Sequence, residues 1–76
     1  MPTIKRFAGC KLSVYGPDHG PPHFHIVGPD FSALVEIATL RVIEGDVRRA
    51  ADAMAWASEN RDVLLNAWNA LNPGRR

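Results

Sequence analysis

The spacing of the apolar residues changes near Gly45, and this change limits the chain to folds in which strands precede helices. Before Gly45 the apolar residues fall in short alternating runs, which are typical of strands with one buried face. The clearest run is 31–37, where every odd-numbered position is apolar and lies on one side of a strand. After Gly45 the chain is rich in alanine and repeats its apolar residues at helical spacing.

Strands followed by helices predict an α+β fold: a small antiparallel sheet of four to five short strands, with two C-terminal helices or one bent helix packed on one face. We expect a single domain over 1–76, with strands and turns in 1–45, helical structure in 46–72 and a tail in 73–76. The expected strands are 4–8, 11–15, 24–27, 31–37 and 41–44.

Polar residues mark the expected ends of the helices. Asp46 is the expected N-cap of the first helix, and Ser58 or Asn60 is the expected cap of the second. Trp56 and Trp68 are expected to anchor the core between the helices and the sheet, because large aromatic residues dominate small cores. The apolar stripes are Val47, Ala50, Ala51, Met54 and Ala57 in the first helix, and Leu64, Trp68 and Leu71 in the second.

The net charge of +1, from nine basic and eight acidic residues, is too balanced for nucleic-acid binding through bulk electrostatics alone. A local basic strip is the alternative, and its candidate phosphate contacts are Lys5, Arg6 and Lys11. Cys10 is the single cysteine, which excludes an intramolecular disulfide and a cysteine-rich zinc site. We interpret it as a half-buried bystander and not as a nucleophile.

The chain contains no apolar stretch that approaches the ~20 residues of a membrane span. Its first residues also lack the long apolar run of a secretory signal, so we expect a cytoplasmic protein without a membrane partner. Because a core this small supplies modest stability, a homo-oligomer or a partner chain covering an apolar face would be an economical supplement.

All three histidines lie within seven residues, in the run Asp18–His25. Two prolines and a glycine make the first part of this run a rigid turn. Side chains alternate along a strand, so His23 and His25 are expected to share one face with their α-carbons ~6.5–7 Å apart. Phe24 would then point to the opposite face and into the core.

Three kinds of chemistry fit this segment. Asp18, His19, His23 and His25 could form a catalytic or phosphate-contacting site, because histidine serves as general acid or base near neutral pH. Alternatively, His23 and His25 with Glu36 from the next strand could bind a divalent metal such as iron, manganese or zinc. In the third interpretation the histidines stabilise turns, and the protein is a structural or interaction module. No cofactor follows from the residues with certainty.

The histidine run stands within an ordered series of short motifs, and the series resembles the small prokaryotic family catalogued as domain of unknown function number 4160. The run Asp-His-x-Pro-Pro-His-Phe-His at 18–25 is specific to that family, and the resemblance covers nearly the whole chain. Its other members often carry histidine where this chain has Asn60. The motifs are Met1-Pro2-Thr3-Ile4, Phe7-Ala8-Gly9, Tyr15 with Asp18–His25, Leu40 leading to Glu44-Gly45, Trp56-Ala57 and Asn66-Ala67-Trp68.

The resemblance implies a stand-alone protein of this size, often encoded beside another small uncharacterised protein. That arrangement is similar to toxin–antitoxin modules. It implies a component of a two-gene module that acts on RNA or through a cognate partner protein, with the histidine-rich turn and strand as its site. The family supplies no established reaction, so the choice between catalysis, metal binding and a structural role stays open.

Overall fold

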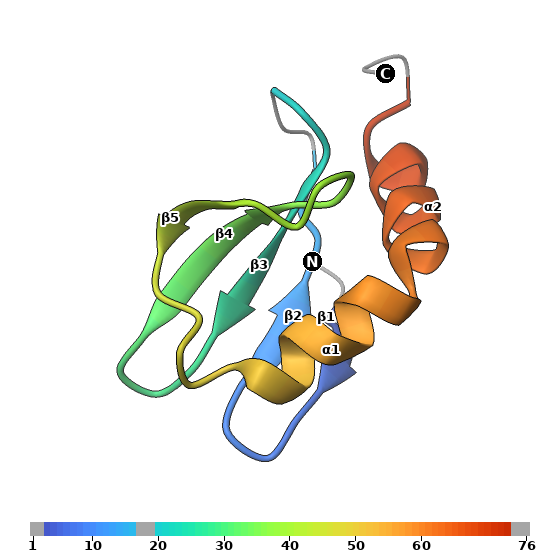
Figure 1. The fold of residues 1–76 in the computed structure, drawn as a ribbon. Coiled ribbons are helices and arrows are strands. Elements are labelled where there is room, and N and C mark those ends of the chain that lie inside the picture. The colour runs from blue at the N-terminus through green and yellow to red at the C-terminus, as the bar shows by residue number, and fades with distance from the viewer. Residues whose placement is uncertain (1–2, 17–19, 74–76) are drawn as a thin grey trace.

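Five strands form one antiparallel sheet in the computed structural model, which describes residues 3–16 and 20–73 (Figure 1). The strands lie in the sheet in chain order, and two helices follow them. This arrangement confirms the predicted α+β fold with two separate helices. The elements are β1 (Thr3–Arg6), β2 (Lys11–Ser13), β3 (His23–Val27), β4 (Ser32–Glu36), β5 (Val42–Gly45), α1 (Ala51–Glu59) and α2 (Arg61–Leu71).

Turns make β1 and β4 shorter than the alternating pattern predicts, and β2 ends at Ser13, two residues earlier than expected. The backbone N–H of Phe7 donates to the carbonyl of Cys10 at 2.8 Å, so the strand β1 ends at Arg6 and Ala8 lies in a turn. Similarly, the N–H of Gly28 donates to the carbonyl of Phe31 at 2.8 Å, and β4 starts one residue later, at Ser32. The spacing of apolar residues does not reveal a turn that is closed by backbone hydrogen bonds, so the strand ends could not be predicted from it.

The strand register gives the sheet two different faces. Ile26 lies between Leu12 and Ala33, and all three side chains are buried with Phe24 and Val35 on the face toward the core. The opposite face, called the histidine face below, carries polar residues on every strand because side chains alternate. By register, this face holds Thr3, Arg6, Lys11, Ser13, His23, His25, Val27, Ser32, Leu34, Glu36 and Glu44.

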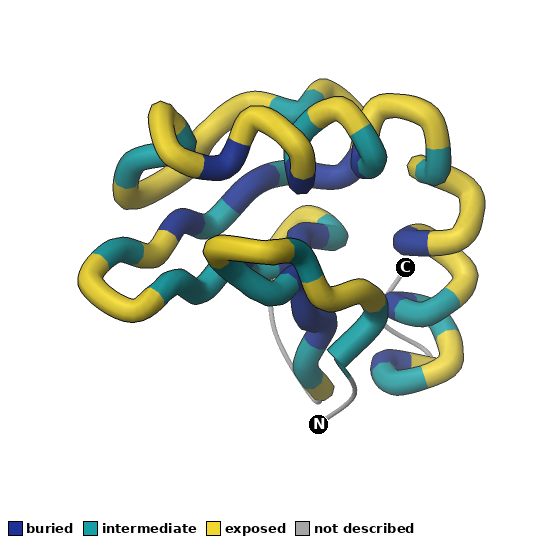
Figure 2. The backbone as a smooth tube through the Cα atoms, turned by 90° about the horizontal axis from the view of Figure 1, so that it is seen from below, coloured by how far each residue is buried: buried dark blue, intermediate teal, exposed yellow. Residues whose placement is uncertain are grey.

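Both helices pack against the core face, and α2 also reaches the histidine face, where its Trp68 packs on the His23 ring. Helix α1 buries Ala53 and Ala57, and α2 buries Leu64 and Trp68, in one cluster with the apolar residues of the sheet. Buried residues gather where the elements meet, and the turns at the periphery are exposed (Figure 2). Ala51 belonged to the predicted apolar stripe, but it is exposed.

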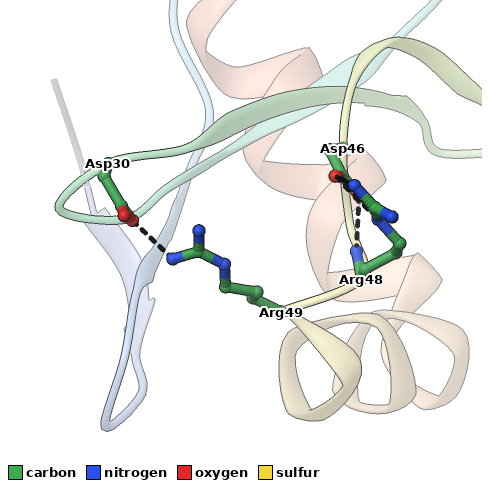
Figure 3. A network of polar contacts seen from close by, with 4 residues as sticks. All are labelled: Asp30, Asp46, Arg48 and Arg49. Atoms are coloured by element: carbon green, nitrogen blue, oxygen red, sulfur yellow. Dashed lines mark hydrogen bonds and ion pairs between the residues drawn. The ribbon is translucent and has the colours of Figure 1, made fainter.

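Helical structure begins at Ala51 and not at residue 46, so the prediction that Asp46 caps the first helix is wrong. The Asp46 carboxylate instead accepts a hydrogen bond from the backbone N–H of Arg48 at 2.9 Å, and it pairs with the Arg48 guanidinium (Figure 3). Aspartate readily closes such a two-residue turn. Hydrogen bonds from the side chain and then the backbone of Arg48 hold the pKa of Asp46 below its usual range.

An ion pair fixes the approach to α1. The Arg49 guanidinium lies 2.7 Å from the Asp30 carboxylate, which joins the residues before the helix to the loop between β3 and β4 (Figure 3). Both side chains are mostly exposed, so the pair orients the helix more than it stabilises the fold.

Asn60 separates the two helices, as predicted, although its side chain does not cap α2. Its Nδ2 donates to the carbonyl of Trp56 at 2.8 Å and so closes the end of α1. Ser58 is not a cap either, because its hydroxyl donates to the carbonyl of Ala55.

At the end of α2, the Asn72 Nδ2 donates to the carbonyl of Tyr15 at 3.2 Å, which ties this helix to the segment after β2. Within the described ranges neither helix could cross a membrane.

Candidate functional site

Four aromatic rings form a row that begins after β2, crosses β3 and ends on α2. The His25 ring lies between Tyr15, at 4.5 Å between ring centroids, and His23, at 5.4 Å. The His23 ring in turn lies 4.7 Å from Trp68. The rings of Tyr15, His25 and His23 meet edge to face, and those of His23 and Trp68 are tilted, which are favourable aromatic arrangements.

The proline turn holds His23 in place. Its side chain is buried, and its Nδ1 lies 2.9 Å from the carbonyl oxygen of Pro21. A carbonyl can only accept, so Nδ1 carries a proton and Nε2 is the basic nitrogen of the neutral ring. The next carbonyl, of Pro22, accepts from the backbone N–H of Ile37 at 3.0 Å. The turn is therefore attached to the end of β4, and this attachment sets the position of the imidazole.

His25 is more exposed than His23 and lies near the centre of the histidine face. Its cross-strand neighbours are Ser13 on β2 and Leu34 on β4. Its Nε2 atom is buried, so the exposed part of the ring lies among its other atoms. On the side toward β5 the ring lines a hollow of about 180 Å³ together with Leu34 and Glu44. A ligand on this face would meet His25 before His23.

A family model described as "Domain of unknown function (DUF4160)" matches residues 9–69. The chain belongs to this family. No curated protein matches the chain, and neither does any solved structure. The DUF4160 match includes all four rings of the row and Lys11, whereas Lys5 and Arg6 precede it.

Glu36, the carboxylate considered with the two histidines, is the cross-strand partner of His23 in this DUF4160 protein. Its Oε1 accepts a hydrogen bond from the Thr39 hydroxyl at 2.6 Å and lies 3.9 Å from the Arg41 Nε. The carboxylate is thus directed to the turn between β4 and β5. In residues 3–16 and 20–73, no group of three or more His, Cys, Asp or Glu side chains is arranged to hold a metal ion.

The three basic candidates separate into two groups. Arg6 and Lys11 are cross-strand partners on the histidine face. Lys11 lies two residues before Ser13, the partner of His25, on β2. Lys5 is the partner of Leu12, which faces the core side, and its Nζ lies 6.0 Å from the Phe7 ring centroid. The structure therefore brings Arg6 and Lys11 to the same face as the histidines, and does not bring Lys5 there.

Two further candidates, Asp18 and His19, lie outside the described residues. Cys10 is half-buried, and burial followed by the charge of Asp52 raises the pKa of its thiol. A raised pKa lowers the fraction of thiolate at neutral pH, which agrees with the interpretation of Cys10 as a bystander.

Two members of the ring row were not predicted as site residues. Tyr15 had a signal, because alternation places it on the same side as Lys11 and Ser13. Trp68 had none, since it is 45 positions from His23 and periodicity identifies it only as a core residue.

Proposed function

We propose that this DUF4160 protein contacts RNA as one component of a two-gene module of the toxin–antitoxin kind, with the histidine face as its contact surface. One observation supports the proposal above the others: His25 and the basic pair Arg6 and Lys11 lie together on the histidine face, beyond the His23 ring on which Trp68 of α2 packs. An antiparallel sheet that presents aromatic rings on its free face is a common platform for single-stranded RNA.

The charges on this face are divided between its two halves. Arg6 and Lys11 lie on β1 and β2, and Glu36 and Glu44 lie on β4 and β5. A phosphate backbone is attracted to the first half and repelled by the second. The RNA strand would therefore run over β1, β2 and β3 and pass the ring of His25.

Acid–base chemistry at the histidines would turn such contact into RNA cleavage. That reaction needs one group to take a proton from the 2′-hydroxyl and another to protonate the leaving oxygen. In this proposal His25 and His23, whose ring centroids lie 5.4 Å apart, are the two groups, and His25 is the nearer to the RNA. His23, held through Nδ1 by Pro21, positions the His25 ring by contact.

Anisotropy of a labelled single-stranded RNA, measured over a series of salt concentrations, tests the contact. Lys11→Ala is expected to weaken binding and to reduce the slope of log K against log salt by ~0.7, which corresponds to one lost phosphate contact on a single strand. His25→Phe preserves the edge contact with Tyr15 but removes both ring nitrogens, so any cleavage should stop while most of the binding remains. Arg61→Ala, on the exposed first turn of α2, is the matched control and should bind like the wild type.

Expression in a bacterial host, alone and with the neighbouring gene, extends this test to the module. A growth effect that the second gene relieves supports the proposal. The absence of both a growth effect and RNA binding would contradict it. In the structural interpretation, His25→Phe would change thermal stability and leave every activity intact.

Metal binding is the alternative that elemental analysis decides. The two histidines offer at most two nitrogen ligands, and the Glu36 carboxylate is engaged by Thr39 and Arg41. We therefore expect metal well below one equivalent in protein purified without a histidine tag. A full equivalent that disappears in the double variant His23→Ala and His25→Ala would establish the metal site instead.

A further inference from the structure

A second hollow lies where two hairpin turns meet, at the end of the sheet away from His23. It has a volume of about 290 Å³, and residues 6–11 of the β1–β2 hairpin and residues 27–29 after β3 form its walls. A volume near 300 Å³ is at the lower end of the range for small-molecule sites. The hollow is therefore large enough for a ligand of about the size of a mononucleotide.

The charges in this hollow are unusual for the fold. Arg6 and Lys11 face one another as cross-strand partners, and like charges at opposed positions destabilise a sheet. Arg41, Arg48 and Arg49 are each paired with a carboxylate, whereas neither Arg6 nor Lys11 has an ion pair within residues 3–16 and 20–73. The lining contains no acidic residue. An anion between the two side chains would remove their repulsion.

The rest of the lining is apolar or backbone. Phe7 and Pro29 provide an aromatic ring and a proline ring, and both can pack against a planar base. Gly9 stands at the tip of the turn with open space around its α-carbon, so the backbone there is accessible to a ligand. Two cations beside apolar rings match a ligand that has both a phosphate and an aromatic base.

We propose that this hollow is a nucleotide subsite, with the phosphate between Arg6 and Lys11 and the base against Phe7 and Pro29. This inference rests on the proposed function, because the nucleotide would be one unit of the RNA that passes His25. Lys11 and Ser13, the partner of His25, are two residues apart on β2, a separation of ~6.5–7 Å. That spacing is about one nucleotide step in an extended strand, so a strand anchored in the hollow would bring its next phosphate to His25.

Cys10 supplies a local probe, since it lines the hollow and is the single cysteine of the chain. Alkylation of the intact protein is followed with adenosine monophosphate, adenosine or inorganic phosphate present. The monophosphate is expected to slow alkylation in a saturable manner, and the other two compounds to protect much less, because each makes half of the contacts. Equal protection by inorganic phosphate would show that the hollow binds a simple anion and does not recognise the base, which would overturn the proposal. Absence of protection by all three compounds would overturn it as well.

Substitutions identify the residues responsible. Arg6→Ala and Lys11→Ala are each expected to weaken the monophosphate by about tenfold, as for the loss of one charge-assisted contact. Lys5→Ala removes the same charge from the next residue but outside the hollow, and should leave the affinity unchanged. Because Arg6→Ala also ends the repulsion with Lys11, its melting temperature without ligand should equal or exceed that of the wild type. Equal loss in all three variants would mean diffuse attraction and no subsite.

Binding of longer RNA and protection of Cys10, both measured on the wild-type protein, distinguish this inference from the proposed function. If the monophosphate protects Cys10 but the protein does not bind longer RNA, the proposed function is refuted and the nucleotide subsite stands. RNA binding without protection of Cys10 would refute the subsite alone.

Discussion

Replacement of Trp68 by alanine is expected to lower the free energy of unfolding by about 3–5 kcal/mol, the usual range for loss of a large buried aromatic side chain. Trp68 is fully buried, joins α2 to the core and packs on His23. A domain of 76 residues has a total stability of roughly 4–11 kcal/mol, so the variant should be largely or partly unfolded near physiological temperature.

Chemical denaturation followed by circular dichroism measures this loss. Trp56→Ala is the matched control: Trp56 is half-buried and meets Phe7 only edge-on, at 6.4 Å between centroids, so its loss should be clearly smaller. Trp68→Phe should also be milder, because the indole Nε1 is buried without a hydrogen-bond partner among the residues described. Equal losses for the two alanine variants would contradict the prediction that Trp68 contributes more to the stability of the core than Trp56 does.

Gly45→Ala is expected to be about as damaging, at roughly 3 kcal/mol, from backbone strain and overpacking together. Gly45 has a φ of +88°, and an added Cβ would overlap the Ser32 carbonyl oxygen and approach the Ala33 α-carbon at 2.7 Å. Both belong to the backbone of β4, which cannot move without disturbing its pairing with β3. The shift in melting temperature and the denaturation midpoint measure the effect.

Two other glycines separate the causes. Gly20 has a φ of +82° but free space around it, so Gly20→Ala should lose only the strain, about 1–2 kcal/mol. Gly9 has neither feature, and Gly9→Ala should be nearly neutral. If Gly45→Ala lowered the free energy of unfolding no more than Gly20→Ala, β5 would separate easily from β4. The close approach of Gly45 to β4 would then contribute little to stability.

Alternation was sufficient to predict the extended segments and which residues point to the core. Phe24 and Ile26 are buried, and His23 and His25 share the other face, as the period of two requires. The helix start was predicted wrongly because Asp46 is a good cap by type, yet its carboxylate is used in a local turn with Arg48. A choice between two local hydrogen bonds depends on where the next element packs, and residue type alone does not reveal it.

In the candidate site, too, some features follow from the sequence pattern and others only from the tertiary structure. Glu36 could be assigned to the polar side of its strand, but its place opposite His23 follows from the register of the β3–β4 hairpin. Its commitment to Thr39 and Arg41 follows from the next turn. Neither relation could be obtained from strand spacing, because the hairpin turn sets which residues become partners.

By itself, the sequence determined the change from strands to helices near Gly45, the two faces of the sheet and the common face of His23 and His25. These properties are periodic, and each depends only on residues a few positions apart. The tertiary structure alone decided that Trp68 packs on His23 and that Arg6 opposes Lys11. It also decided that the basic and acidic residues of the histidine face lie on opposite halves of that face. Such contacts depend on strand register and on the angle at which α2 meets the sheet, and these are set by the packing of the whole core.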